Sequence, residues 1–490
     1  MAITGRRRNR SSIQTANSRI LLYGRGEDLF WSKSEPFNMR INLREPRYIV
    51  PIISILAVVI FSVLLGQVIS GFSYKISLIL VLGVAIFLVT LINTDAGLFI
   101  LILSMLLSPE IMLGRVPGRE IVVRIDDFLL AIITFAWLAK TAIYKKLALF
   151  IKTPLNKIIS LYIFLCLIST LRGIALGYVV PAKGLFYLAR YIEYFLLYIL
   201  VANQIHSRKQ IKFFLATFFI VCALVSVIGI LQIPSGERVS APFEGKEGEP
   251  NTLGGYLLFI LCLAIGIYLQ DVSPRMKMGL LGLSALIIFP FFYTLSRASY
   301  SGIIFSFLAL IVLSKKKFML VSVMTALIIA GIMVKPEAVL SRVKYTFQER
   351  QANLTKIGNI YLDPSSTARV VSWASSLQTW KKNPLLGRGV AGTPFVDGQY
   401  ILVLSELGIL GLLAFLWLLW SVLKHSMSVL RKTDDDLYKG LTLGFITGFI
   451  GLTIHSVTAN TFILIRIMEP FWFIAGIIMI LPTLKKLENE

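Results

Sequence analysis

Charge is scarce in this sequence. Only 15% of its 490 residues are Asp, Glu, Lys or Arg, whereas a soluble domain has about 25%. Hydrophobic residues make up 56% of the chain, and the mean hydropathy is +0.77. This composition excludes a soluble globular protein and indicates a chain that lies in a membrane.

Cysteine and histidine are also rare, with three residues of each. The cysteines all lie in apolar runs, without the spacing of a zinc site or a disulfide framework: Cys166, Cys222 and Cys262. Two of the histidines lie in polar connections, so only His455 is expected near the outer surface. We therefore expect no metal ion and no cofactor.

Long apolar runs are abundant. A window of about 19 residues finds about fourteen of them, and in lipid such a run satisfies its backbone hydrogen bonds by forming a helix. The sequence predicts an all-α polytopic membrane protein with about 12–14 transmembrane helices. The runs cover 49–70, 76–93, 97–108, 127–144, 158–176, 187–205, 213–233, 254–270, 278–295, 298–314, 318–334, 400–423, 440–458 and 461–482.

Basic residues outnumber acidic ones by 49 to 26, which gives a net charge of +23. Such an excess can mark a nucleic-acid-binding protein. Here most lysines and arginines gather on one side of the predicted membrane, beginning with the Arg-rich N-terminus, so we expect no nucleic-acid partner. Their distribution follows the positive-inside rule with both termini in the cytoplasm. The polar first 48 residues are unlike a cleavable signal peptide.

The connections between the runs define five regions. One connection, 335–399, is so long that we expect it to carry function, and it is predicted on the outer face together with 109–126 and 234–253. The regions are a basic cytoplasmic tail (1–48), eleven transmembrane helices (49–334), the large external loop (335–399), three further transmembrane helices (400–482) and a second cytoplasmic tail (483–490).

The large external loop contains two predicted amphipathic helices. Residues 336–350 place apolar side chains four apart among basic ones, as in a helix at the membrane interface. The second helix spans about 365–382, with one of two adjacent serines as its N-cap. Arg369 lies in its first turn beside Trp373. This arginine either reaches a lipid headgroup or belongs to a site.

Two acids near the twelfth apolar run also draw attention. Asp397 lies at the lip of this run, and Glu406 lies inside it. An acid in hydrocarbon is unfavourable, so it normally has a partner or a functional role. We expect Glu406 to be a buried structural partner, with Arg466 as a candidate counter-ion. A glycine-rich turn that carries Arg388 leads to Asp397.

Five polar residues at other runs are further candidates. Arg297 lies between two runs with no room for a loop, where it needs an anion or an acid. Asn251 opens a run and is expected as its N-cap. Arg190 and Glu193 are three apart on one helix, which fits either an internal ion pair or a ligand contact. His455 is either a catalytic base or a polar residue hydrogen-bonded between helices.

Four ordered motifs resemble those of the O-antigen ligase and Wzy-type polysaccharide polymerase superfamily of inner-membrane glycosyltransferases. The resemblance covers roughly residues 185–480 and implies an all-helical GT-C-type fold whose external loop closes over the site. It also implies polyprenyl-diphosphate-linked sugar substrates and no metal. The motifs are PN-x-x-GGY (250–256), TLSRASYSG (294–302), TARVVSW…NPLLGRGVAG (367–392) and DGQYILVLSELGILGLL (397–413).

The resemblance also implies roles for individual residues. Arg297 and Arg369 match two arginines that hold the donor diphosphate. The ligase branch has a His-Asn pair where this sequence has Asp397 and Gly398, and polymerase-branch members often carry an acid there. We therefore expect Asp397, Arg297 and Arg369 to be catalytic. The expected substrate-binding residues are Arg388, Asn251, Tyr400, Arg190, Trp373 and His455, the last also a competing base.

These roles fit the chemistry of glycosyl transfer from a polyprenyl diphosphate, which needs a base and positive charge at the departing diphosphate. The leading expectation is a polymerase that elongates a lipid-linked glycan on the outer face of a bacterial plasma membrane. The alternatives are a ligase that moves a finished glycan to an acceptor, and a flippase or other transporter, although no internal repeat typical of transporters is visible. Expected partners are the lipid-linked donor and acceptor, membrane lipid, and a chain-length regulator and flippase of the same pathway.

Overall fold

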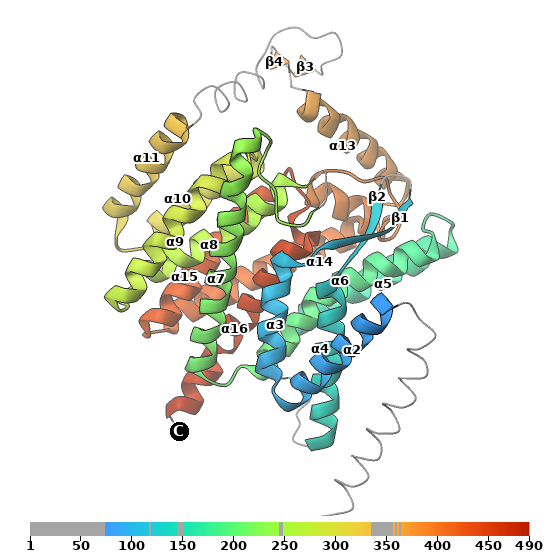
Figure 1. Ribbon diagram of the computed structural model, residues 1–490. Coiled ribbons are helices and arrows are strands. Elements are labelled where there is room, and N and C mark those ends of the chain that lie inside the picture. The colour runs from blue at the N-terminus through green and yellow to red at the C-terminus, as the bar shows by residue number, and fades with distance from the viewer. Residues whose placement is uncertain are drawn as a thin grey trace, which may run out of the picture. The chain divides into compact units, whose positions relative to one another are not determined.

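The computed structural model describes residues 74–116, 119–144, 151–244, 248–334, 356–357, 360–361 and 364–489 (Figure 1). All of them belong to one unit of the chain, Tyr74–Glu490. The predicted basic tail, the first apolar run and the predicted interfacial helix at 336–350 lie outside the described residues.

Every apolar run that falls on described residues coincides with a helix, which confirms the all-α polytopic fold. The first helices are α2 (Tyr74–Ile92), α3 (Thr94–Leu107), α4 (Ile125–Tyr144), α5 (Asn156–Ala175), α6 (Pro181–Gln204), α7 (Arg208–Gln232) and α8 (Pro250–Tyr268). They are followed by α9 (Pro274–Tyr293), α10 (Arg297–Leu313), α11 (Lys317–Val334), α13 (Pro364–Lys382), α14 (Gln399–Lys432), α15 (Asp436–His455) and α16 (Ile465–Asn489), with short 3₁₀ turns η1 (Ile233–Ser235) and η2 (Thr461–Ile463).

Eight of the described helices are long and apolar enough to cross a membrane, and shorter apolar helices accompany them. The eight are α5, α6, α7, α8, α9, α14, α15 and α16. Large apolar side chains such as Leu231, Met278 and Val312 are more than 70% exposed. Surfaces of this kind are expected where helices face lipid rather than water.

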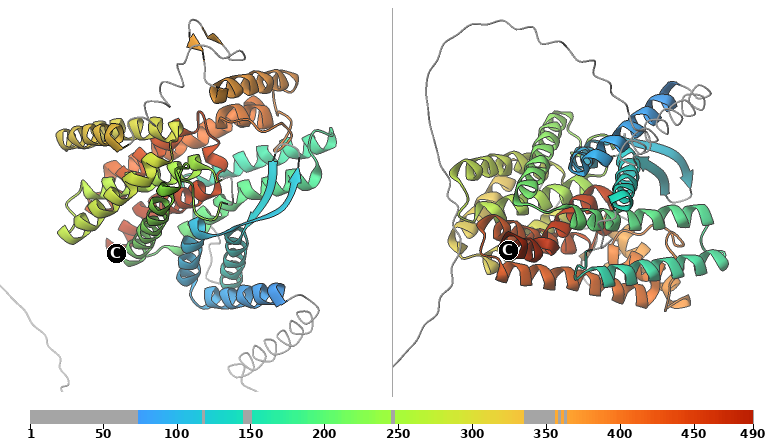
Figure 2. Two further views of the ribbon diagram at one scale, coloured as in Figure 1. Left: turned by 45° about the horizontal axis from the view of Figure 1, so that its top comes forward. Right: turned by 90° about the horizontal axis from the view of Figure 1, so that it is seen from below.

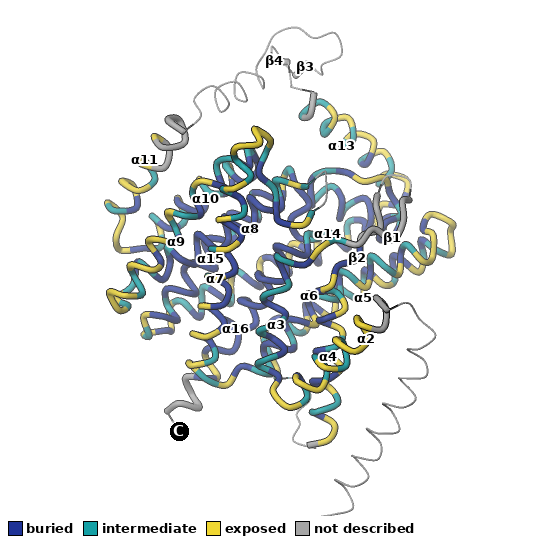
Figure 3. Tube along the Cα trace, viewed as in Figure 1, coloured by how far each residue is buried: buried dark blue, intermediate teal, exposed yellow. Residues whose placement is uncertain are grey.

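The centre of the unit is formed by α8, α15 and α16, whose traces are almost entirely buried (Figure 3). Glycines allow α8 and α15 to pack backbone against backbone. A Cβ at Gly444 would lie 2.5 Å from the Cys262 carbonyl oxygen, and one at Gly266 would lie 2.4 Å from the Gly444 nitrogen. Such close approach stabilises helix pairs in membranes, where no hydrophobic effect drives their association.

Two strands interrupt the helical pattern where the sequence predicts only a loop. Strands β1 (Glu110–Val116) and β2 (Arg119–Arg124) pair antiparallel within the connection 109–126. A short pair, β3 (Lys356–Ile357) and β4 (Ile360–Tyr361), lies in the large loop. The β1 residue Glu110 also receives a backbone contact from the connection 234–253, because its N–H donates to the Phe243 carbonyl. Two connections that are predicted on the same face therefore meet.

Helix α13 lies against α14, as Figures 1 and 2 show. It begins at Pro364, so the two serines predicted as N-cap, Ser365 and Ser366, lie inside the first turn. Helix α14 contains one residue with non-helical backbone angles, Gly408. Its N-terminal end follows Asp397, which contacts α13, and the candidate site is built there.

Candidate functional site

Asp397 is held by two residues of α13. Arg369 Nε lies 3.2 Å from Asp397 Oδ2. Trp373, one turn further along α13, donates its indole N–H to the Asp397 backbone carbonyl. One helix therefore fixes both the side chain and the backbone of this acid. The side chains of Arg369 and Asp397 keep 24% and 39% of their surface exposed, so a ligand can reach the pair.

The backbone on either side of Asp397 is fixed by the segment 456–460, which follows α15. Asn460 donates its side-chain N–H to the Val396 carbonyl at 2.9 Å, and the Gln399 N–H donates to a carbonyl of the same segment. Gly398 has a φ of 109°, and a Cβ there would lie 2.9 Å from another carbonyl oxygen of this segment. Only glycine fits this position, which explains the Asp-Gly sequence.

Tyr400 and His455 lie next to this segment and are bonded within the protein. The Tyr400 hydroxyl donates to the Thr453 carbonyl at 2.9 Å and accepts a hydrogen bond from Ser456. The His455 side chain is fully buried, and its Nδ1 lies 2.7 Å from Thr461 Oγ1. Asp397 is therefore the more accessible of the two candidate bases.

The motifs at 250–256 and 294–302 meet through one hydrogen bond. Ser296 donates its hydroxyl hydrogen to Asn251 Oδ1 at 2.7 Å, which ties the first turn of α8 to the start of α10. A Cβ at Gly254 would lie 2.2 Å from Ser299 Oγ, so the two helices are in close contact here. Arg297, the first residue of α10, is placed by this junction.

The prediction that Asn251 is the N-cap of α8 is wrong. The helix begins at Pro250, and Glu249 is its N-cap. Proline is favoured at the first helical position because it has no N–H to satisfy there and its φ is already close to the helical value. Asn251 thus lies within the first turn, where its side chain is available to Ser296.

The turn that precedes Arg297 is braced by Arg238. Its guanidinium donates to the Thr294 carbonyl at 2.9 Å and to the Leu295 carbonyl at 3.3 Å. Leu295 has a φ of 49°, a left-handed conformation that leucine rarely adopts. The position of Arg297 at the start of α10 therefore depends on a strained turn and on Arg238 from the connection 234–253.

Glu249 links the α8 end of the site to Asp397. Burial raises the pKa of Glu249, the hydrogen bond from the Thr252 hydroxyl opposes this, and the carboxylates of Asp397 and Glu110 raise the pKa further. Asp397 and the start of α8 are thus close enough to interact electrostatically. The motifs at 250–256 and 294–302 are joined by the Ser296–Asn251 hydrogen bond, and those at 367–392 and 397–413 are joined by the Arg369–Asp397 pair.

A polar pocket of about 230 Å³ opens beside Glu249. The lining contains both acids and arginines. It therefore offers hydrogen-bond donors and acceptors together, as a hydroxyl-rich ligand requires. Its charged lining consists of Glu110, Arg124, Arg190, Glu244, Glu249 and Arg466. Of these residues, the sequence predicts only Arg190 as a site residue.

Arg466 contacts several parts of this pocket. Its position inside an apolar run indicates that it has a partner but does not identify that partner. The side chain is buried, and its guanidinium donates to the carbonyls of Leu106, Ser108 and Pro242. It also lies 3.4 Å from Glu110 and 3.6 Å from Glu244. One arginine thus joins the connections 109–126 and 234–253, and its counter-ions are these two glutamates rather than the predicted Glu406.

The pocket contains an acid that titrates near neutral pH. Burial raises the pKa of Glu244 to about 7, although the nearby Arg466 favours the charged form. In an unfolded chain the pKa of Glu is about 4.3, so between these values the folded protein holds a proton that the unfolded chain releases. The stability contributed by Glu244 is therefore complete below about pH 4.3 and is lost as the pH rises through about 7.

We predict that Glu244→Gln flattens this pH dependence, because glutamine keeps the shape and stays neutral. Between about pH 5 and pH 8 the stability of the wild type should fall by roughly 3 kcal/mol more than that of the variant. Thermal denaturation of the purified protein across this range measures the difference. Glu237→Gln, at an exposed acid of the same connection, should leave the wild-type profile unchanged. Equal profiles for wild type and Glu244→Gln would contradict the prediction.

Arg190 forms an ion pair with a residue of α4, a partner that the sequence does not predict. Arg190 lies 3.0 Å from Asp127 Oδ2, and its guanidinium also lies over the Phe186 ring. Arg124, next in the pocket, bonds to Asp126 and lies 3.6 Å from Glu469. These pairs join α4, α6 and α16 beneath the polar pocket.

The glycine-rich stretch with Arg388 closes against α5 and the bend of α14. Arg172 of α5 donates to the Gly387 carbonyl at 3.0 Å, and the Gly389 N–H donates to the Glu406 carbonyl at 2.7 Å. The Arg388 guanidinium lies 4.9 Å from the centre of the Tyr178 ring. Arg388 is thus positioned by a cation–π contact, beside the connection between α5 and α6.

Glu406 is buried and anchors this stretch. Its Oε1 accepts a hydrogen bond from the Ala391 N–H at 2.9 Å, and its Oε2 accepts one from the Tyr191 hydroxyl at 3.4 Å. Glu406 therefore joins α14 to α6 and to the glycine-rich stretch. This is the structural role that its position predicts, with partners different from the expected Arg466.

The bend of α14 at Gly408 completes the support of the stretch. Gly408 has a φ of 67° and a ψ of −167°, and a Cβ there would lie 2.3 Å from the Leu385 carbonyl oxygen. The next two residues, Ile409 and Leu410, donate their N–H groups to the Pro384 and Leu385 carbonyls. The stretch thus accepts hydrogen bonds that the α14 backbone loses at its bend.

Gly408→Ala should therefore destabilise the protein by more than about 3 kcal/mol, because backbone strain and a collision with a carbonyl act together. The midpoint of thermal unfolding measured by size-exclusion chromatography after heating tests this. Gly177→Ala is the matched control, since Gly177 has a φ of 73° and open space around it. The control variant should lose only about 1–2 kcal/mol of stability, the cost of a left-handed backbone conformation for alanine. Similar losses in both variants would refute the role of the collision.

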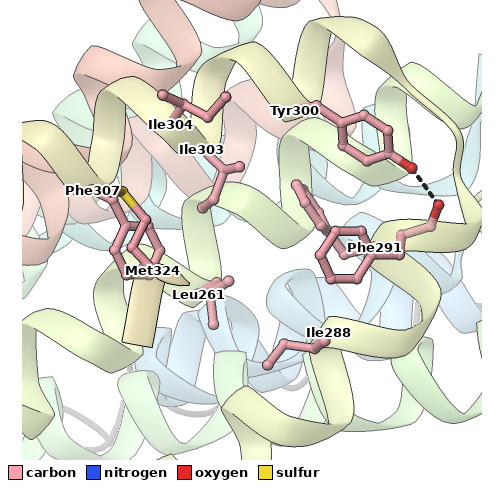
Figure 4. Close-up of a pocket in the computed structure, with 9 residues that line it drawn as sticks. Leu261, Ile288, Phe291, Tyr300, Ile303, Ile304, Phe307 and Met324 are labelled. Carbon is pink, nitrogen blue, oxygen red and sulfur yellow. Dashed lines mark hydrogen bonds between the residues drawn. The ribbon is translucent and has the colours of Figure 1, made fainter. Parts of the chain in front are cut away.

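An apolar pocket lies on the same face of α10 as Arg297. Figure 4 shows Tyr300, one turn after Arg297, at its edge, with its hydroxyl directed to a backbone carbonyl of α9. The pocket has a volume of about 130 Å³ and is lined by apolar and aromatic side chains of α8, α9, α10 and α11, among them Leu261, Phe291, Ile304 and Met324. A charged group and an apolar recess thus lie side by side on α10.

Comparison with known families adds a match over part of this region. Residues 282–416 match the family model described as O-Antigen ligase. The matched segment runs from α9 into α14 and includes Arg297, Arg369 and Asp397. None of the curated proteins compared with the chain matches it. This match agrees with the resemblance found in three of the four motifs, those at 294–302, 367–392 and 397–413.

Proposed function

We propose that the protein is a polysaccharide polymerase that joins polyprenyl-diphosphate-linked oligosaccharide units on the outer face of a bacterial plasma membrane. The observation that carries this proposal is the Arg369–Asp397 pair at 3.2 Å, in which a guanidinium lies beside a carboxylate within the matched segment. Both termini are then cytoplasmic, in accordance with the positive-inside rule.

In this proposal Arg369 and Arg297 hold the donor diphosphate. Guanidinium groups bind phosphate oxygens through paired hydrogen bonds and stay charged in any surroundings. Arg369 uses only its Nε toward Asp397, so its terminal NH₂ groups can turn to a phosphate. The positive charge of both arginines stabilises the diphosphate as it leaves, which makes a metal ion unnecessary for this step.

Asp397 acts as the general base in the same scheme. Its carboxylate takes the proton of an acceptor sugar hydroxyl while the hydroxyl oxygen forms a bond to the anomeric carbon of the donor. The bond from that carbon to the diphosphate oxygen breaks, and polyprenyl diphosphate leaves with the electron pair. The exposure of Asp397 supports this role over the fully buried His455.

The remaining predicted residues surround the path of the substrates. We assign Trp373 and Tyr400 to the acceptor sugar beside Asp397, and Arg190 to sugar hydroxyls in the polar pocket that it lines. Asn251 supports Arg297 through Ser296, and we assign Arg388 to substrate binding as well. The apolar pocket beside Arg297 accommodates the first part of the polyprenyl tail.

A ligase that moves a finished glycan to an acceptor is the second candidate within this family. The description of the matching model favours it. The Asp397-Gly398 sequence favours the polymerase, because an acid stands where the ligase branch has histidine. A lipid-linked oligosaccharide transporter is the third candidate and belongs to another functional class. A chain-length regulator and a flippase of the same pathway would act with the polymerase.

Purified protein in liposomes with lipid-linked repeat units distinguishes these candidates. The polymerase is expected to produce a ladder of longer lipid-linked glycans without added metal. A ligase leaves the repeat units unextended but transfers a supplied long glycan to an acceptor. A transporter moves the units across the bilayer without lengthening them. Either of the last two outcomes would overturn the proposal.

A further inference from the structure

A groove between α7 and α9 lies away from the Asp397 site. Its volume is about 590 Å³, within the range of about 300–1,000 Å³ that ligand pockets occupy. Ile267 of α8 and Leu437 of α15 are buried at its floor. Its walls are apolar and include Leu215, Ala216, Phe219 and Ala223 of α7 and Leu280, Leu283 and Leu286 of α9.

The depth of the groove comes from two glycines on α9. Gly279 and Gly282 lie one turn apart and line the groove. A Cβ added at either one would meet no atom within 4 Å, so neither glycine serves close helix packing. Alanines on the facing wall, Ala216 and Ala223, are also small. Small residues on α7 and α9 therefore leave a trough between the two helices. Larger side chains at these positions would fill it.

Two cations stand at one end of the groove. Lys212 of α7 and Arg275 of α9 both line it, near the starts of their helices. Within the described part of the chain no carboxylate pairs with either of them, although nearby cations are paired: Arg208 with Asp435 and Lys277 with Asp271. The positive end of this otherwise apolar groove is thus open to an anion.

The groove has the length of one membrane leaflet. From Lys212 to Ala223 it follows α7 for about 17 Å, since each helical residue adds about 1.5 Å. Half of the hydrocarbon core of a bilayer is about 15 Å. An anionic head at one end, an apolar trough and this length together match a single membrane lipid.

We propose that the groove binds one phospholipid with a net negative headgroup. Its phosphate contacts Lys212 and Arg275, and one acyl chain lies along Gly279 and Gly282. The headgroup end is the end of the helix bundle at which α7 and α9 begin. This site is separate from glycan transfer, because its lining includes none of Asp397, Arg369 and Arg297.

Native mass spectrometry of the detergent-purified full chain tests the headgroup contact, with phosphatidylglycerol and phosphatidylcholine titrated as probes. We expect the wild type to bind phosphatidylglycerol more tightly, by about fivefold for each cation. The double variant Lys212→Gln/Arg275→Gln should lose this preference of about twenty-five-fold. Lys209→Gln, at an exposed cation outside the groove, should keep it. Equal binding of both lipids by the wild type would overturn the proposal.

Filling the groove tests the chain contact. Gly279→Phe should lower phosphatidylglycerol binding at least tenfold without harming the fold, because the new side chain enters open space. Leu281→Phe adds bulk on the same helix outside the groove and should bind as the wild type does. If gel filtration shows that Gly279→Phe aggregates, Gly279→Leu replaces it, because leucine is smaller than phenylalanine. Glycerol phosphate, which lacks acyl chains, should not compete. Unchanged binding in the filled variants, or competition by glycerol phosphate, would refute a lipid in the groove.

Discussion

Asp397→Asn is expected to lower glycan elongation by about 10²–10⁴-fold, the contribution of a positioned general base. Asparagine has nearly the same shape and can still accept a hydrogen bond from Arg369, so α13 should stay in place. What it loses is the ability to take a proton from the acceptor hydroxyl. Initial rates of ladder formation in proteoliposomes, at matched protein content, provide the measurement.

His455→Ala distinguishes the two candidate bases. His455 is buried and bonded to Thr461, so its removal leaves a cavity and an unsatisfied hydroxyl between α15 and η2. We expect a lower thermal stability and a rate that stays within about tenfold of the wild type. Full activity in Asp397→Asn together with loss of turnover in folded His455→Ala would transfer the role of base to the histidine.

Arg297→Ala and Arg369→Ala are expected to reduce turnover by about 10²–10³-fold each, the effect of removing one preorganised donor to developing charge. The protein should still insert and elute as one species. Arg369→Lys keeps the charge but not the planar pair of donors, so we expect an intermediate rate. Lys381→Ala, at an exposed cation near the end of the same helix, is the matched control and should elongate normally.

A comparison of binding and turnover separates a catalytic role for Arg369 from a structural one. An arginine that only anchors α13 to Asp397 would, when removed, change stability and the apparent affinity for both substrates. An arginine that stabilises the leaving diphosphate would mainly change kcat. Near wild-type polymer levels in Arg297→Ala or Arg369→Ala would remove that residue from the catalytic assignment.

The helices could be predicted from the sequence because the membrane imposes a single local rule. Runs of about 20 apolar residues have only one good way to satisfy their backbone in lipid, and the described helices follow these runs. The hairpin of β1 and β2 was not predicted, since its residues 110–124 read as a mixed polar connection. A Pro-Gly pair between two runs that contain valine and isoleucine is nevertheless a local turn signal in this connection.

The site could be predicted only in part for a similar reason. The order of the motifs indicates Arg297, Arg369 and Asp397 as candidates. The contact between Arg369 and Asp397 joins residues that are 28 apart in the sequence, and the loop between them brings them together. The partners of Arg466 lie more than 200 residues away in sequence, so spacing carried no information about them. The sequence pairs Glu406 with Arg466 because both are charged residues in apolar runs, but the Glu406 oxygens accept hydrogen bonds from the Ala391 N–H and the Tyr191 hydroxyl.

The bend at Gly408 also has a consequence for how α14 fits the bilayer. A straight helix of its 34 residues would be about 51 Å long, well beyond the hydrocarbon core of about 30 Å. The part after the bend, from Ile409 to Lys432, is about 36 Å long and can cross the core alone. The part before the bend is not needed to cross the core, and the bend allows it to run in a different direction. A change that straightened α14 would therefore move Asp397 away from Arg369 although both residues remained in the sequence.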